Sequence, residues 1–339
     1  MPTGCGLHEA QILDRSGAVV AHADVLTEVE WNRVLDEVST ARVVITPDGD
    51  CCEKLKNVRS WRHKLAIWRD GDPVWEGPIL MPEWSTGQVE IRAMDVLAWL
   101  DRRVPHQSVR FSRRDLTEIA AWLIADGFEP DDPGHQVQVI APAGVTGRRS
   151  YVRDVGQTGD HLRDLADTGL DYTAVGSVIL LLPEDHATSV GSLTDIDLPE
   201  GLTVTEDGAA LATRWVVHGG EDDVKGEAGG RSAYYGLLER SVEEPSIEDA
   251  ADAAAAARSR LRGSRPVPVW ISSERVTLSP DAPVDVPHLV PGWCVDVATT
   301  ATCRTISQRL KITGVKVTEN RDGESVQLQL APTGTGVEN

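Results

Sequence analysis

The chain has 339 residues, of which 41% are apolar and 25% are charged, and its formal net charge is −20. A chain of this length and apolar content buries more than half of its surface on folding, which excludes a disordered protein and is typical of two or three domains. The excess of carboxylates repels phosphates and therefore disfavours a nucleic-acid-binding protein. The same net charge is typical of a soluble protein. It would also suit a channel wall past which DNA moves without binding.

Targeting segments and metal motifs are not evident in the sequence. There is no run of about 18 apolar residues that predicts a membrane-spanning helix, and residues 1–11 lack the pattern of a signal peptide. We therefore expect a protein that is made and kept in a cytosol. The cysteines have no CxxC spacing and are odd in number, which predicts free thiols rather than disulfides or a zinc site; they are Cys5, Cys51, Cys52, Cys294 and Cys303.

Residues 1–103 alternate between apolar and polar positions as strands do. Two short apolar runs around Asp14–Gly17 predict a hairpin, and Val29 opens a further strand that places alternate residues up to Leu35 on one face. A last strand precedes a short helix that begins near Asp95. We predict a small β-barrel that is closed by this helix.

Within that barrel, residues 59–80 read RSWRHKLAIWRDGDPVWEGPIL and contain three tryptophans. The alternation predicts a strand from Trp61 to Trp68, a turn at Asp70–Asp72 and a second strand. Such clustered tryptophans are also common in ligand-binding surfaces, so a recognition role is the alternative to packing for this segment.

Residues 104–195 change to a helical period and predict a compact α+β insert domain. Ser112 and Asp115 have capping-box spacing before a helix that ends at Gly127. A second helix is predicted in residues 158–168, and a hairpin is predicted to turn near Gly176.

Residues 196–333 return to strands and predict a second β-barrel domain. An acidic, glycine-rich segment at 220–230 predicts a mobile loop, and an alanine-rich helix is predicted over 247–262. The last hairpin turns at 320–323, and residues 334–339 are expected to form a flexible tail.

Catalytic signatures are missing from the sequence. It contains no GxSxG, GxxxxGK[ST], GxGxxG or HExxH motif. His161 lies between Asp160 and Asp164, and the loop Glu184–His186 holds two carboxylates and a histidine, but neither group has the further ligands that a metal site needs. We predict no catalytic residue, no metal site and no cofactor.

Four tryptophans remain as candidates for structural or interface roles, because they lie at alternating positions beside apolar residues. They are Trp31, Trp61, Trp68 and Trp75. Packing or subunit contact is favoured over a platform for stacking sugars. Two alternatives stay open: a cell-wall hydrolase that uses an unrecognised carboxylate pair, and a glycan-binding adsorption protein that uses exposed tryptophans.

Five strings occur in a characteristic order along the chain. They are VEWNRVLDEVSTARVVI, VRSWRHKLAIWRDGDPVWEGPI, VEIRAMDVLAWLDRR, YYGLLERSVEEPSIEDAADAAAAARSRL and LVPGWCVDV. In this joint order the sequence resembles phage tail hub proteins, especially the minor tail proteins of long-tailed phages of actinobacteria. The resemblance covers nearly the whole chain, and none of the strings is a catalytic signature.

The resemblance implies an α+β, predominantly β fold in which two hub-type β-barrel domains are separated by an α+β insert. It implies a homotrimer of pseudo-sixfold symmetry that joins the tail tube and the distal tail protein ring to the tip. The channel of such a ring holds the C-terminus of the tape-measure protein and passes DNA in transit. Other minor tail, tip or fibre proteins are further implied partners.

The resemblance also implies a location and a non-enzymatic role. We expect a virion protein at the tail tip that is assembled in the cytoplasm of the host bacterium. Enzymatic members of the family carry a lytic domain as a C-terminal extension, whereas here the sequence stops at Asn339, directly after the last hairpin. An attached lysin is therefore not expected.

Overall fold

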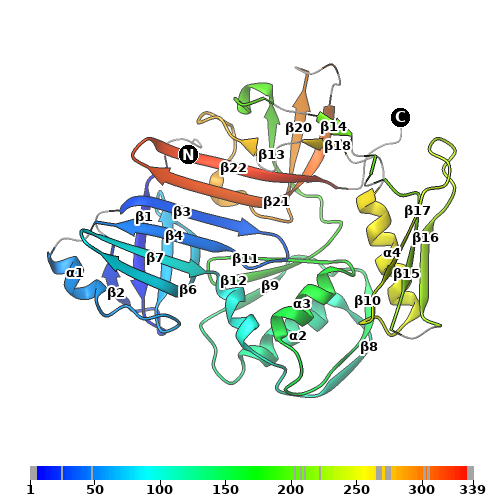
Figure 1. The fold of residues 1–339 in the computed structure, drawn as a ribbon, viewed down its shortest axis with the longest axis horizontal. Coiled ribbons are helices and arrows are strands. Elements are labelled where there is room, and N and C mark those ends of the chain that lie inside the picture. The colour runs from blue at the N-terminus through cyan, green and yellow to red at the C-terminus, as the bar shows by residue number, and fades with distance from the viewer. Residues whose placement is uncertain are drawn as a thin grey trace.

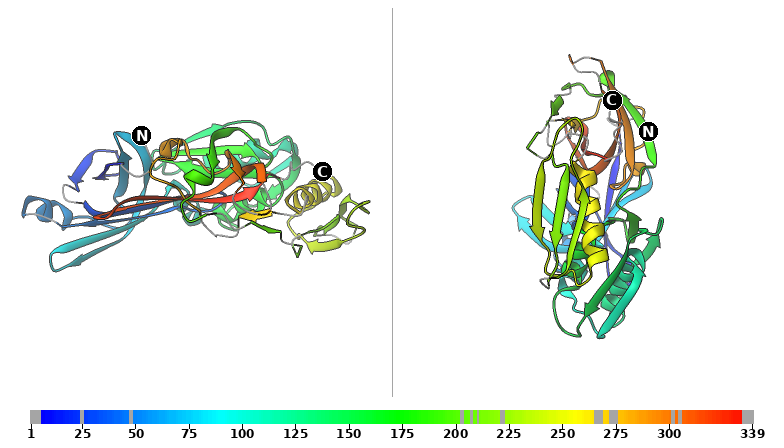
Figure 2. Two further views of the ribbon diagram at one scale, coloured as in Figure 1. Left: turned by 90° about the horizontal axis from the view of Figure 1, so that it is seen from above. Right: turned by 90° about the vertical axis from the view of Figure 1, so that its right-hand side faces the viewer.

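A computed structural model describes most of the chain, and strands make up most of its regular structure (Figure 1). The described residues are 6–23, 26–46, 49–201, 204–206, 208–209, 211–220, 223–264, 269–271, 276–300, 303 and 306–333. Cys5 and the predicted tail 334–339 lie outside them. The views in Figure 2 show an elongated molecule that is built around one long sheet.

The N-terminal part forms antiparallel strands. They are β1 (His8–Leu13), β2 (Val19–His22), β3 (Leu26–Val34), β4 (Thr40–Ile45), β5 (Lys64–Arg69), β6 (Asp72–Ser85) and β7 (Gln88–Met94). Both predicted turns are confirmed, and Gly17 and Gly71 there adopt φ of 85° and 89°, which glycine allows without a steric cost. The strand with Trp68 begins only at Lys64, because Trp61 lies in the preceding turn.

Two helical elements accompany these strands. The 3₁₀ helix η1 (Val96–Arg102) begins as predicted, with the Asp95 side chain accepting from the Leu97 N–H. Helix α1 (Gly49–Leu55) was not predicted. Gly77 on β6 passes so close to the chain after β7 that an added Cβ would lie 1.9 Å from the Met94 carbonyl oxygen, which explains the glycine of the sequence WEGP.

The insert has the predicted α+β composition. Its elements are β8 (Val109–Asp115), α2 (Leu116–Phe128), β9 (Gln136–Val139), β10 (Thr146–Tyr151), α3 (Thr158–Ala166), β11 (Leu170–Val175) and β12 (Val178–Pro183). The predicted hairpin at Gly176 and both helices are confirmed. The predicted cap at Ser112 is wrong: Ser112 lies within β8, and the Asp115 side chain caps α2 by accepting from the Thr117 N–H at 2.9 Å.

The remaining elements carry the chain back to the main sheet. They are β13 (Ser189–Thr194), η2 (Asp195–Asp197), β14 (Val204–Glu206), β15 (Arg214–His218), β16 (Lys225–Gly229), β17 (Glu239–Glu243), α4 (Ala250–Ser264), β18 (Val269–Ile271), β19 (Val276–Thr277), η3 (Val286–His288), β20 (Cys294–Thr299), β21 (Ile306–Asn320) and β22 (Gly323–Pro332). The alanine-rich helix and the turn at 320–323 are confirmed. The loop predicted at 220–230 is wrong for Lys225–Gly229, which form a strand beside β15.

Strands from both ends of the chain share one twelve-stranded sheet. Its order is β13-β20-β21-β3-β4-β7-β6-β5-β1-β2, and β22 and β19 continue from β21. The junction is the antiparallel pair of β21 with β3, in which Val317 lies opposite Trp31. Across the described strands this hydrogen-bonded order stays open, and no closed barrel is found. A predominantly β, α+β fold is therefore confirmed without the two separate barrels.

Among the described residues, buried side chains form three cores. The first fills the main sheet and combines residues 10–93 with residues 193–328, and the second packs α2 and α3 against β11 and β12. The third lies between α4 and the sheet of β15, β16 and β17 at one end of the molecule (Figure 1). The predicted domain boundaries at 103/104 and 195/196 stay predictions. The two outer segments share the first core. No described helix is long and apolar enough to cross a membrane.

Candidate functional site

Trp31 lies in the core, at the junction between the two parts of the main sheet. Its side chain has no exposed surface, and its Nε1 donates to Nε2 of His8 at 3.0 Å. The other ring nitrogen of His8 lies 2.5 Å from a carboxylate oxygen of Glu319 on β21. Because Nε2 accepts, Nδ1 carries the proton and donates to Glu319. The strand β1 is thereby linked to the C-terminal hairpin.

Arg33 is a fully buried cation that has backbone carbonyls as its hydrogen-bond partners. Its guanidinium donates to the carbonyls of Val74 at 2.7 Å, Pro287 at 2.9 Å and Leu289 at 3.1 Å, and it lies 5.0 Å from the ring of Trp31. Burial lowers the pKa of Arg33 to about 10, so the group remains charged at neutral pH. Its bonds join β3 to β6 and to η3.

Trp61 lies between the main sheet and the insert. It adopts φ of 61°, its N–H donates to the Ile79 carbonyl at 2.8 Å, and its ring meets Trp99 of η1 edge to face at 4.9 Å. The guanidinium of Arg102 lies 5.4 Å from the ring. The half-buried Trp61 packs against the core of the insert.

Trp75 and Trp68 occupy neighbouring strands of the main sheet. Trp75 on β6 is 3% exposed and belongs to the first core, whereas Trp68 on β5 is half-buried and lies opposite Glu9 and Pro73. No ring contact among the described residues joins two of the four predicted tryptophans. The structure therefore distributes them over the sheet instead of forming a platform.

A buried ion pair fastens the C-terminal hairpin to β5. Arg69 donates through Nε and Nη2 to the two carboxylate oxygens of Glu324, each bond being 2.7 Å long. Both side chains are 1% exposed. Because such a two-bonded pair fixes direction as well as distance, it sets how the hairpin lies on β5.

A second buried polar cluster joins the insert to both parts of the main sheet. Lys311 on β21 lies 2.5 Å from Asp171 on β11, and the side chain of Asp36 accepts from the Tyr172 N–H at 2.8 Å. Burial, with the nearby Asp171 charge, raises the pKa of Asp36 well above its usual range. Burial also raises the pKa of Asp171, although Lys311 opposes this shift.

A third buried pair holds α4 against the insert. Arg149 on β10 donates to Asp252 at 2.6 Å and to the Thr168 hydroxyl at 3.0 Å, and the Arg148 N–H donates to the same Asp252 oxygen at 2.8 Å. Both charged side chains are at most 5% exposed. The three buried pairs thus join the segments that the sequence predicted as separate domains.

The histidines and carboxylates that the sequence offered as weaker candidates have structural contacts. His161 directs Nε2 to the Val155 carbonyl at 3.1 Å, while Glu184 pairs with Arg262 and His186 packs against Trp293. Burial lowers the pKa of His186. Within the described part of the chain, no group of three or more histidine, cysteine or acidic side chains is arranged to hold a metal ion.

A surface groove lies against the outer half of β6, which is the part of this strand from residue 80 to residue 85. It has a volume of about 540 Å³ and is lined by Lys56, Val58, Arg59, Ser60, Pro82 and Trp84. The side chain of Trp84 is 48% exposed. This groove was not predicted from the sequence. Pro82 could have indicated its position, because a proline within a sheet is typical of an edge that has no neighbouring strand.

No protein-family model matches the sequence, and no curated protein does either. Solved structures do match. The 43 kDa tail protein of prophage MuSo2 from Shewanella oneidensis has 13% identity and a TM-score of 0.68, and the match covers 97% of this chain and 99% of that chain. The tail protein of Neisseria meningitidis MC58 has 14% identity and a TM-score of 0.66, with 96% and 97% covered.

The chain has the fold of phage tail proteins. The predicted resemblance is thus confirmed at the level of the fold. The tail-protein fold also extends to the E. coli c3393 protein, a type VI secretion component described as similar to the T4 tail proteins gp27 and gp5. That match has 13% identity and a TM-score of 0.53, and it covers 91% of this chain and 73% of that chain.

Proposed function

We propose that this chain is the structural tail-tip hub, or minor tail protein, of a long-tailed phage. In this proposal three copies form a ring in which the strand-rich segments 1–103 and 196–333 alternate with pseudo-sixfold symmetry. The observation that carries it is the fold match over nearly the whole of both chains, 97% and 99% with a TM-score of 0.68. The coverage matters because the proposed role needs all parts of the chain, and a match over one domain alone would not support it.

The buried pairs support a mechanical role. Arg69–Glu324, Lys311–Asp171 and Arg149–Asp252 each join segments that are far apart in sequence. A buried pair is costly to separate, so these joints resist movement of one segment against another. A ring that transmits force between a tube and a tip needs such resistance.

The proposed partners follow from the position of a hub. They are the distal tail protein ring on one side, other tip or fibre proteins on the other, and the C-terminus of the tape-measure protein within the channel. DNA is a partner only in transit, and the net charge of −20 suits a wall to which phosphates do not adhere. The proposed location is the tail tip of the virion, after assembly in the host cytoplasm. The proposed role is not enzymatic.

The decisive experiment measures mass and shape together. Light scattering on purified protein and negative-stain images of purified protein and of isolated tails are expected to give three copies per ring. Isolated tails are included because a ring can need its neighbours to assemble. A protein that is monomeric in solution and lies elsewhere than the tip in labelled tails contradicts the proposal.

A further inference from the structure

The outer half of β6 has a free edge. Up to Ile79 this edge is occupied, because Ile79 N–H donates to the His63 carbonyl at 2.9 Å. Beyond that residue, β7 is the strand that pairs with residues 81–85 in the described sheet. This part of the β6–β7 hairpin projects from the sheet (Figure 2).

The register defines which backbone groups face the free edge. Ser85 and Gln88 close the hairpin around a two-residue turn. Because hydrogen-bonded and non-hydrogen-bonded pairs alternate in an antiparallel ladder, Pro82 and Trp84 turn their backbone groups away from β7. The edge therefore offers the Trp84 N–H and two carbonyls to an added strand.

The groove beside this edge supplies an apolar wall. The Trp84 Nε1 donates to the Leu55 carbonyl at 3.2 Å, which holds the indole across the groove. Val58 and Pro82 add further apolar surface. A ring that is half exposed and fixed by a hydrogen bond is a ready contact for an apolar side chain.

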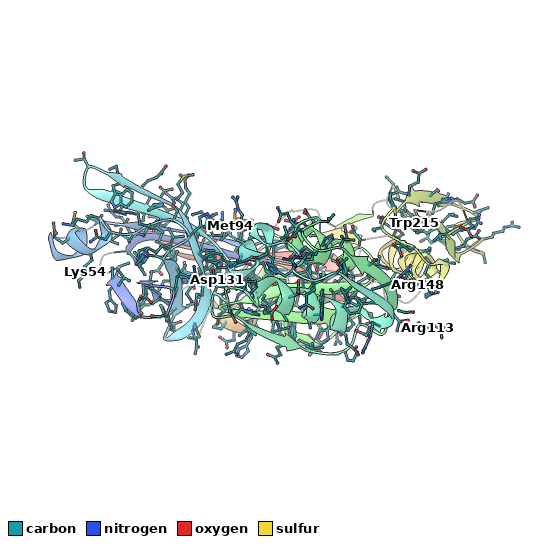
Figure 3. All side chains as sticks on the ribbon, turned by 90° about the horizontal axis from the view of Figure 1, so that it is seen from below. Lys54, Met94, Arg113, Asp131, Arg148 and Trp215 are labelled. Carbon is teal, nitrogen blue, oxygen red and sulfur yellow. The ribbon has the colours of Figure 1, made fainter. Side chains whose placement is uncertain are left out.

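Among the residues that the structure describes, the lining of the groove contains two cations, Lys56 and Arg59, and no carboxylate, while Glu53 beside it pairs with Lys56. Residues 54–64 contain five lysines and arginines and no carboxylate, in a chain whose net charge is −20. Four of these cations are exposed, namely Lys54, Lys56, Arg59 and Arg62. Figure 3 shows Lys54 at the end of the molecule opposite Arg113 and Arg148.

We propose that the free edge of β6 and its cationic groove bind an extended acidic segment of a second copy of this chain. This inference rests on the proposed homotrimer. Copies that each carry a charge of −20 repel one another, so a ring needs local contacts of opposite charge, and a second copy is rich in carboxylates. A contact between different surfaces of successive copies closes a ring. Strand addition supplies its backbone hydrogen bonds.

The test compares two triple charge reversals that change net charge equally. The groove variant combines Lys54→Glu, Lys56→Glu and Arg62→Glu, three exposed cations of residues 54–64, of which Lys56 lines the groove. The opposite-end variant combines Arg113→Glu, Arg148→Glu and Arg153→Glu, three exposed cations of the insert, and Figure 3 labels the first two at the other end of the molecule. Arg59 is kept because it donates to the carbonyls of Lys56 and Val58 and shapes the loop. Circular dichroism and thermal unfolding confirm that each variant folds. Trp84→Pro, which removes the edge N–H and the ring, is the independent third variant.

Sedimentation equilibrium over a concentration series provides the readout. We expect the groove variant and Trp84→Pro to weaken self-association by about tenfold or more, while the opposite-end variant assembles like wild type. If both charge variants weaken equally, or if the groove variant assembles normally, the groove inference fails while the trimer stands. Binding of another tail protein at the groove, with self-assembly intact, also overturns it. A wild-type chain that is monomeric in solution and in tails contradicts the homotrimer itself.

Discussion

Arg69 and Glu324 form a two-bonded ion pair between strands that are separated by 255 residues of sequence. The pair is buried on both sides and ties β5 to β22, so each partner neutralises a charge that water cannot reach. Removing Glu324 takes two bonds of 2.7 Å from Arg69 and leaves the Asp70 carboxylate, 3.1 Å away, as a counter-charge. We therefore expect substitution of either residue to lower the free energy of unfolding.

Glu324→Gln is expected to lower the free energy of unfolding by about 1.5–3 kcal/mol, because buried Arg69 loses its two-bonded carboxylate partner while the longer contact with Asp70 remains. Urea unfolding followed by tryptophan fluorescence measures the loss. The matched control is Glu118→Gln, which breaks the exposed pair with Arg114 and should cost about 0.5 kcal/mol or less. Equal losses in the two variants would contradict a special role for the buried pair.

Trp75→Ala is expected to cost about 3–5 kcal/mol, because it opens a cavity in the first core. Trp61→Ala should cost less, since that ring is half-buried, and it should loosen the insert against the sheet. Both variants should lose folding or ring assembly before any binding activity. Thermal unfolding and particle images provide the measurement. Variants that fold and assemble normally, yet lose host adsorption, would instead favour a glycan-binding role for these tryptophans.

Asp95 predicts a pH dependence. Burial raises the pKa of Asp95 to about 7, so the folded protein binds this proton more tightly than the unfolded chain does. The contribution of the Asp95 carboxyl to the free energy of unfolding is therefore fully present below about pH 4 and is lost as pH rises towards 7. Asp95→Asn imitates the protonated form. The unfolding free energy of the variant, measured relative to wild type, should rise across this window by up to about 4 kcal/mol.

A flat difference between the two proteins from pH 4 to 8 would show that Asp95 titrates normally. The comparison isolates this one group, because all other carboxylates are common to both proteins.

Gly226→Ala tests the packing of α4 on β16. An added Cβ would lie 2.0 Å from the backbone of Ala253, so the helix must move. We expect a loss of at least about 1–3 kcal/mol and faster hydrogen exchange in residues 250–264. Gly230→Ala, which meets open space, is the control and should leave exchange in the helix unchanged. Unchanged exchange in Gly226→Ala would show that the helix is not closely packed there.

Local patterns predicted most elements of the fold. Alternation located the hairpins at 14–17 and 70–72, and spacing located the helix with Leu116 and the alanine-rich helix. Choosing Ser112 as the cap failed because Ser112 and Asp115 are both good capping residues, and pairing with β10 draws residues 109–115 into a strand. Lys225–Gly229 were not predicted to form a strand, because glycines and charged residues are uncommon in strands. Packing against α4 stabilises this strand.

The long-range joints could not be predicted. Arg69 and Glu324 are ordinary charged residues in sequence, and their burial depends on the register of two distant strands. Alternation places Arg33 on the same face of its strand as Val29 and Trp31, yet its three carbonyl partners come from segments that no local pattern brings together. For the same reason sequence patterns could not show that the two outer segments share one sheet.

The pairing of β21 with β3 has a consequence for synthesis on the ribosome. The edge of β3 stays without its neighbour until about 280 further residues have been made, since β3 ends at Val34 and the paired part of β21 begins at Gly314. Folds with such distant contacts form slowly, and exposed strand edges aggregate meanwhile. Pulse-labelled chains should therefore become protease-resistant in their first hundred residues only after the last hairpin emerges. The yield of native protein should then depend on chaperones more than on final stability.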